Sequence, residues 1–109
     1  MVNKTNSSLN TDYIRLKGSS GDTYSAAADV TDGSYFRFYE YDADKNIIDY
    51  WRLQYDHPQL SGYKYISRVF GDTTKYFRVL SSNSEAANTV THIIIKNETT
   101  GEILFEWRA

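Results

Sequence analysis

The residues of this chain best suited to recognition are tyrosines and an arginine that alternate within one short run. The run SYFRFYEY covers residues 34–41, and spacing by two places alternate side chains on the same face of an extended strand. A five-residue loop over residues 42–46 then sets Trp51 opposite Arg37, where a cation–π contact can form. Tyrosine, tryptophan and arginine are the side chains that most often anchor protein interfaces. The predicted binding patch consists of Tyr35, Arg37, Tyr39, Tyr41 and Trp51.

The two histidines give little support for catalysis. His57 precedes Pro58 in a predicted loop, and the predicted register places the mid-strand residue His92 opposite Glu106. That arrangement indicates a structural or weakly pH-sensitive pair. The chain has no G-x-S-x-G elbow and no cysteine nucleophile. We therefore expect a non-enzymatic protein without catalytic residues.

One acidic run resembles the start of a calcium-binding loop. Asp42, Asp44 and Asn46 have the spacing that opens an EF-hand loop. The match then fails, because Ile47 stands where the glycine belongs and Leu53 stands where the bidentate glutamate belongs. Asp and Asn are also the usual residues of a hairpin turn. We predict a turn at this run, with no metal and no cofactor.

The charge balance argues against a nucleic-acid-binding protein. The 109 residues include 12 Lys and Arg and 14 Asp and Glu, and the net charge of -2 gives no long-range attraction for a polyanion. The N-terminus lacks the apolar stretch of a signal peptide, and no apolar run is long enough to cross a bilayer. These features do not identify the compartment. The absence of cysteine weakly favours the cytoplasm or a place in a larger assembly.

Short β-rich runs separated by turn clusters predict an all-β fold. The length fits one domain, with residues 1–10 as a disordered tail and residues 11–109 as a single β domain. We predict an antiparallel β-sandwich of about seven or eight short strands, with a small closed or partly open barrel as the alternative. Residues 82–88 are predicted as a loop or one helical turn. The predicted strands are 12–17, 23–30, 34–41, 47–55, 63–70, 75–81, 89–96 and 102–108.

Two further hairpins allow the pairing register to be predicted. A loop over residues 97–101, with Gly101 in the left-handed conformation, closes the C-terminal hairpin. A loop between the runs 63–70 and 75–81 sets Arg68 against Arg78, so that we predict either an anion between them or a different loop length. The C-terminal hairpin then carries a core stripe of Ile93, Ile95, Ile103, Phe105 and Trp107.

These observations favour a domain that binds a protein partner through its tyrosine-rich sheet, in a structural, accessory or inhibitory role. A carbohydrate-binding module is the first alternative and requires a coplanar row of exposed rings. A single-strand nucleic acid binder of the OB type is the second alternative, which the net charge disfavours. We expect no membrane association, and the sequence leaves a homo-oligomer open.

Overall fold

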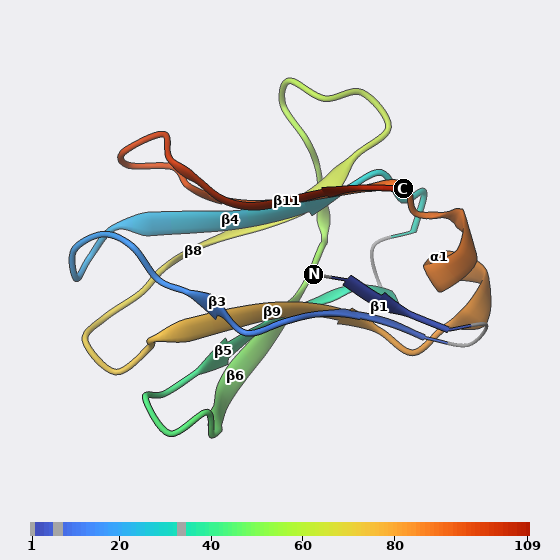
Figure 1. The fold of residues 1–109 in the computed structure, drawn as a ribbon. Coiled ribbons are helices and arrows are strands. Elements are labelled where there is room, and N and C mark those ends of the chain that lie inside the picture. The colour runs from blue at the N-terminus through green and yellow to red at the C-terminus, as the bar shows by residue number, and fades with distance from the viewer. Residues whose placement is uncertain (1, 6–7, 33–34) are drawn as a thin grey trace.

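Two antiparallel sheets pack face to face in the computed structural model, which describes residues 2–5, 8–32 and 35–109 (Figure 1). Sheet A has the strand order β1-β2-β9-β5-β6, with β3 also paired to β9. Sheet B has the order β11-β10-β4-β8-β7. The predicted antiparallel β-sandwich is therefore confirmed, and over the described residues the sheets do not close into the alternative barrel.

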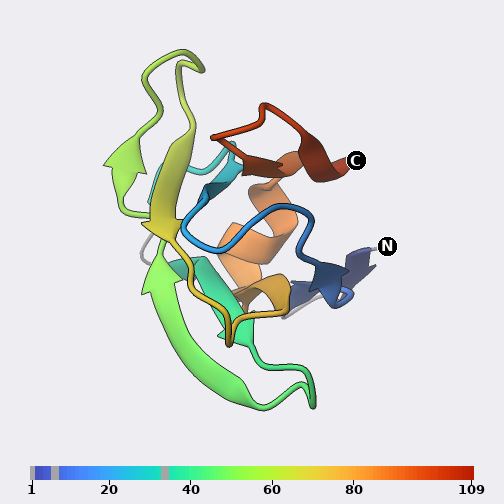
Figure 2. The same cartoon turned by 90° about the vertical axis from the view of Figure 1, so that its left-hand side faces the viewer.

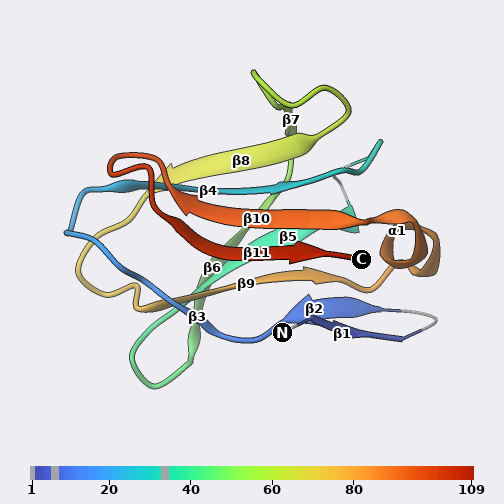
Figure 3. The same cartoon turned by 45° about the horizontal axis from the view of Figure 1, so that its top comes forward.

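The strands are short, and apart from β1 and β2 they lie close to the predicted runs. Sheet A is formed by β1 (Val2–Lys4), β2 (Leu9–Thr11), β3 (Ile14–Arg15), β5 (Arg37–Tyr41), β6 (Ile47–Arg52) and β9 (Tyr76–Ser81). Sheet B is formed by β4 (Thr23–Ala28), β7 (Tyr55–Asp56), β8 (Lys64–Val69), β10 (His92–Asn97) and β11 (Ile103–Arg108). Helix α1 (Ser84–Thr89) closes one end of the sandwich, beyond the ends of β9 and β10, as Figure 3 shows. In the described part of the chain, no helix has the length and apolar character needed to cross a membrane.

The core lies between the two sheets and is rich in aromatic rings. Phe38 from β5 and Phe77 from β9 have ring centroids 4.8 Å apart, and Phe70 lies 5.0 Å from Phe77. The three alanines of β4, a central strand of sheet B, are all buried. The fully buried members of the core include Leu9, Tyr24, Phe36, Phe38, Leu53, Phe77, Val79, Ile93 and Ile95.

The N-terminal segment is part of the sheet, so the predicted disordered tail is wrong for most of its described residues. β1 and β2 pair antiparallel, and β2 pairs in turn with β9. Leu9 is fully buried in the core, which gives β2 a hydrophobic anchor. The polar residues around this single leucine concealed the strand pattern. Met1 and residues 6–7 lie outside the described residues.

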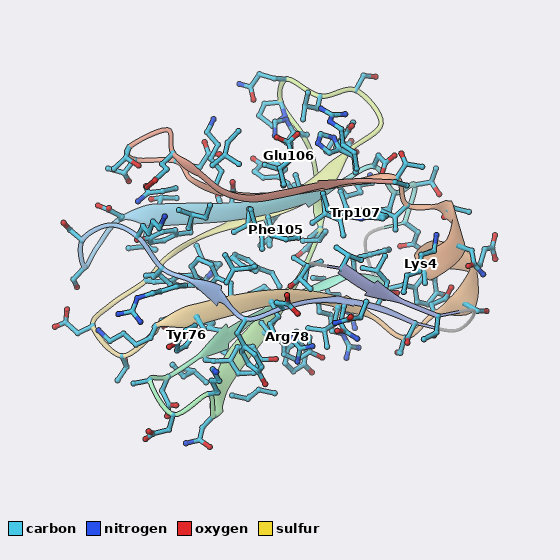
Figure 4. The ribbon with its side chains drawn as sticks, viewed as in Figure 1. Lys4, Tyr76, Arg78, Phe105, Glu106 and Trp107 are labelled. Atoms are coloured by element: carbon cyan, nitrogen blue, oxygen red, sulfur yellow. The ribbon has the colours of Figure 1, made fainter. Side chains whose placement is uncertain are left out.

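The C-terminal hairpin keeps four of the five predicted inner-face residues, but its strands pair in a different register from the predicted one. Ile93 pairs with Trp107 and Ile95 pairs with Phe105, and all four side chains pack in or against the core. Figure 4 shows Phe105 and Trp107 on the side of sheet B that faces sheet A. A register shift between Ile95 and Lys96 changes the pairing beyond that point. Ile103 is therefore 51% exposed and does not belong to the predicted core stripe. The pairing beside the loop is already offset from the predicted one, with Lys96 opposite Ile103, and with the further shift His92 lies opposite Arg108 instead of Glu106.

The predicted pairing of Arg68 with Arg78 is wrong, because their strands belong to different sheets. β8 pairs with β4 in sheet B, whereas β9 pairs with β5 in sheet A. The connection between β8 and β9 crosses from one layer to the other (Figure 1). The Arg68 guanidinium instead lies 3.7 Å from the centre of the Trp51 ring across the edge of the sandwich. No anion site is needed to explain these two arginines.

Candidate binding face on sheet A

A β-bulge sets the side-chain directions of the β5–β6 hairpin. Tyr41 pairs with Ile47 as predicted, but the register shifts between Glu40 and Tyr41. From that point every pairing is offset by one residue, which exchanges the faces of β6. Tyr39 consequently lies opposite Tyr50. The outer face of sheet A gains Tyr50, a residue that the predicted register placed on the reverse face.

Trp51 lies on the inner side of sheet A, so its predicted place in the tyrosine patch is wrong. It pairs with the buried Phe38 and packs against the core. The Trp51 indole Nε1–H donates a 2.9 Å hydrogen bond to Glu40 Oε2, and the Thr74 hydroxyl donates to Glu40 Oε1 at 2.8 Å. Glu40 is only 8% exposed, so these two donors satisfy a buried carboxyl group. Trp51 therefore helps to close the sandwich edge.

The remaining predicted site residues lie on or beside the outer side of sheet A, with very different exposure. Tyr35, just before β5, is 50% exposed, whereas Arg37 and Tyr39 are half-buried. Tyr41 is only 4% exposed, because the Tyr13 ring packs edge-on against it with centroids 4.9 Å apart. Tyr41 is therefore a supporting residue of this surface and not an exposed anchor.

Two tyrosines of this surface were missed because they come from other strands. Tyr13 precedes β3, and its ring centroid lies 6.3 Å from that of Tyr76 on β9. Only the strand order, which brings β3 and β5 to opposite sides of β9, shows that these rings meet. Figure 4 shows Tyr76 and Arg78 on the outer side of sheet A. We call this surface the tyrosine–arginine face; it consists of Tyr13, Arg15, Tyr35, Arg37, Tyr39, Tyr41, Lys45, Tyr50, Arg52, Tyr76 and Arg78.

Cations lie over several rings of the tyrosine–arginine face. The Arg37 guanidinium is 5.0 Å from the Tyr50 ring centre, and the Arg78 guanidinium is 4.7 Å from the Tyr13 ring centre. The Lys45 ammonium lies 5.1 Å from the Tyr13 ring centre and 5.4 Å from the Tyr76 ring centre. These contacts hold the rings in place and cover part of their π faces.

Arg78 also ties two strands together. Its Nε–H donates to the Thr11 carbonyl at 2.9 Å, and a terminal guanidinium nitrogen donates to Asn10 Oδ1 at 3.0 Å. The Tyr13 ring on its other side completes this arrangement. Arg78 therefore fixes the N-terminal strands against β9 and rigidifies one end of the face.

A small pocket adjoins the face beside β5. Its volume is ≈ 200 Å³, which is below the roughly 300–1,000 Å³ typical of small-molecule sites. The pocket has the size of about one amino-acid side chain and lies between a cation and several hydroxyl and amide groups. It is lined by Ser8, Leu9, Asn10, Tyr35, Arg37, Tyr39, Leu80, Ser81 and Ser82.

The acidic turn after β5 has a structural role. The Asp42 carboxylate accepts 2.9 Å hydrogen bonds from the backbone N–H groups of Asp44 and Asn46, which closes the hairpin. These bonds, that to Asn46 first, lower the pKa of Asp42. Lys45 occupies the left-handed region at a φ of 63°. Among the described residues there is no group of three or more His, Asp or Glu placed to hold a metal ion.

His92 belongs to a hydrogen-bonded chain on the outer side of sheet B. Its Nδ1 lies 2.7 Å from the Tyr63 hydroxyl oxygen, and its Nε2 lies 2.6 Å from Glu106 Oε2. His92 is only 4% exposed, so both ring nitrogens are satisfied by side chains. The hydrogen bond from His92 is the main cause of the lowered pKa of Glu106. The predicted pairing of His92 with Glu106 thus exists as a side-chain contact, although the strand register differs.

His57 is a turn residue. Its Nδ1 accepts hydrogen bonds from the backbone N–H groups of Gln59 at 3.1 Å and Leu60 at 3.0 Å. Burial lowers the pKa of His57, which favours the neutral ring that these bonds require.

The fold and the face together define an antiparallel β-sandwich with a tyrosine–arginine surface on one sheet. Comparison of the chain with protein-family models, with curated protein sequences and with solved structures gave no match in any of the three.

Proposed function

We propose that this protein is a non-enzymatic binding domain that engages a protein partner through the tyrosine–arginine face. The observation that carries the proposal is the clustering of six tyrosines with arginines on one outer sheet surface. Tyr50 and Tyr35 are about half exposed, while Tyr39 is half-buried and held between Tyr41 and Tyr50. Rings fixed in this way lose little conformational entropy on binding, and Tyr and Arg are enriched among the residues that dominate interfaces.

The edge of the sheet beside this face supports a protein as the partner. β6 is the last strand of sheet A and, among the described residues, pairs with β5 alone. Figure 2 shows β6 curving along the margin of the molecule. Ile47 and Ile48 at its start are 59% and 43% exposed. An unpaired apolar edge strand can accept a strand of another chain through main-chain hydrogen bonds.

The ring geometry gives less support to a carbohydrate partner. Stacking on a sugar needs exposed ring faces in a coplanar row, but Tyr13 makes interplanar angles of 74° with Tyr41 and 82° with Tyr76. The Tyr50 ring already carries the Arg37 guanidinium. Because a guanidinium lies over the ring face, it also hinders the stacking of bases on which proteins that bind single-stranded nucleic acids depend.

Selection of a phage-displayed random peptide library on the immobilised protein tests this proposal. The enriched peptides are measured against wild type and against Tyr50→Ala. We expect the dissociation constant to rise about tenfold or more for Tyr50→Ala, as for loss of an interface anchor. Tyr55→Ala provides the control, because Tyr55 is also exposed, at 54%, but lies on β7 of sheet B.

The outcomes separate clearly. Peptides that lose affinity for Tyr50→Ala and keep it for Tyr55→Ala support the proposal. A selection without enriched peptides, or peptides that bind both variants like wild type, contradicts it. The melting temperatures of both variants are measured first, so that unfolding is not read as lost binding.

A further inference from the structure

Arg37 and Arg52 form a like-charge pair within the tyrosine–arginine face. They are direct cross-strand partners on β5 and β6, where opposite side chains lie about 5 Å apart at Cβ. Like charges in this position destabilise a sheet. Within the described residues, neither guanidinium is ion-paired with a carboxylate. The isolated domain therefore retains a repulsion that an anion on this face would relieve.

The surrounding positions add further positive charge. Arg15 on β3 and Arg78 on β9 face the same side, and the Lys45 ammonium reaches it from the turn. No Asp or Glu stands at the outward-facing strand positions of sheet A in the described part of the chain. The whole chain has a net charge of -2, so this face is a local departure from an otherwise acidic surface.

We propose that the partner is an acidic protein segment whose carboxylate groups bind Arg37 and Arg52. This inference rests on the proposed function and specifies the chemistry of the partner. A carboxylate can accept paired hydrogen bonds from a guanidinium, so one acidic side chain between the two arginines replaces repulsion by two attractions. The pocket beside Arg37 supplies Asn10 and Ser81 as further polar contacts for such a segment.

The structure favours carboxylates on a protein over the phosphates of a nucleic acid. Binding of a single-stranded nucleic acid depends on stacking of bases on aromatic rings. On this face, the Arg37 and Arg78 guanidinium groups already lie over the Tyr50 and Tyr13 rings. A long polyanion would also meet the net negative charge of the rest of the molecule. A short acidic segment avoids this repulsion because it contacts only the positive face.

The test is an NMR titration at low salt with three probes of equal length. These are a glutamate decapeptide, a glutamine decapeptide and a ten-residue oligothymidylate, and the readout is the Nε–Hε signals of the arginines. We expect the glutamate peptide to shift the Nε–Hε signals of Arg37 and Arg52, and the glutamine peptide to leave these signals unchanged. Arg52→Gln should lower the affinity for the glutamate peptide by about two- to fivefold, the effect of losing one exposed charge contact. Lys17→Gln, in the loop after β3, is the matched control.

Two results would overturn the inference. The first is that the glutamate peptide shifts the Nε–Hε signal of neither arginine, or binds wild type and Arg52→Gln with equal affinity. The second is that the oligothymidylate binds at these arginines with higher affinity than the glutamate peptide does. Failure of this inference is distinguishable from failure of the proposed function. Selected peptides that need Tyr50 but lack Asp and Glu would leave the proposed function intact and contradict the acidic partner.

Discussion

Arg37 on β5 lies directly opposite Arg52 on β6, and within the described residues no carboxylate is paired with either. The bulge between Glu40 and Tyr41 sets this pairing, because it fixes which residues of β6 face outward. Like charges in direct cross-strand positions are expected to lower stability, and this pair lies beside exposed tyrosines such as Tyr50. Strain of this kind is expected where a surface is complementary to a partner and not to itself.

Arg52→Glu should stabilise the isolated domain while it weakens partner binding. The substitution replaces a like-charge pair by an opposite-charge pair, worth about 0.2–1 kcal/mol in the free energy of unfolding. Urea denaturation measures this gain, and the glutamate decapeptide titration measures the loss. Lys17→Glu is the control, because Lys17 lies outside the sheet and faces no cross-strand arginine. A loss of stability in Arg52→Glu would show that the two guanidinium groups do not repel one another.

Tyr39→Ala should weaken partner binding by more than ~1 kcal/mol, the level expected of an interface anchor. The Tyr39 ring lies between Tyr41 and Tyr50, at centroid distances of 6.3 Å and 5.3 Å. Its removal takes away both contact area and the support of the Tyr50 ring. Calorimetric titration with a selected peptide measures the change. A large drop in melting temperature with unchanged affinity would assign Tyr39 to the fold instead.

Tyr41→Ala should act on stability. Tyr41 is 4% exposed and packs beneath Tyr13, so truncation leaves a cavity and costs about 3 kcal/mol or more. Urea denaturation provides the measurement, with Tyr35→Ala as the exposed control. Equal stability of the two variants would contradict the supporting role assigned to Tyr41.

Trp51→Phe should destabilise the domain by about 1–3 kcal/mol. Phenylalanine keeps most of the ring volume but removes the indole N–H, which leaves Glu40 Oε2 without that donor in a buried site. The double variant Trp51→Phe with Glu40→Gln, measured beside both single variants, isolates the interaction by a double-mutant cycle. Additive free energies would show that the indole and the carboxylate are not coupled.

Glu106 should make stability depend on pH in the acidic range. The hydrogen bond from His92 holds the pKa of Glu106 below its ordinary value of 4.5. Because the folded-state pKa is the lower one, this contribution is present above pH 4.5 and is lost as the pH falls through the folded-state value. Urea unfolding as a function of pH should therefore show a flatter acid limb for Glu106→Gln. Part of the slope should remain, because Asp22 and Asp42 also have lowered pKa values. Identical acid limbs for the two proteins would contradict the role of this contact.

The sandwich could be predicted from sequence because alternation and turn residues mark most of its strands. Ile93, Ile95, Phe105 and Trp107 alternate over two runs, and the structure places all four toward the core. Leu9 shows the limit of this signal, since one apolar residue in a polar stretch gives no period to detect.

Only part of the tyrosine–arginine face could be predicted. Tyr39 and Arg37 share a strand, so spacing alone groups them. Trp51 was placed wrongly because a bulge adds one residue to a strand and exchanges its faces without any mark in the sequence. Tyr13 and Tyr76 join the face through the strand order around β9, which depends on long-range pairing.

The measurement that tests the central claim most directly is NMR chemical-shift mapping of a selected peptide on the protein. A peptide whose binding depends on Tyr50 should shift backbone amide signals of β5, β6 and β9, together with that of Tyr13. Shifts confined to the outer strands of sheet B, or to the loop that contains His57, would contradict a binding role for the tyrosine–arginine face.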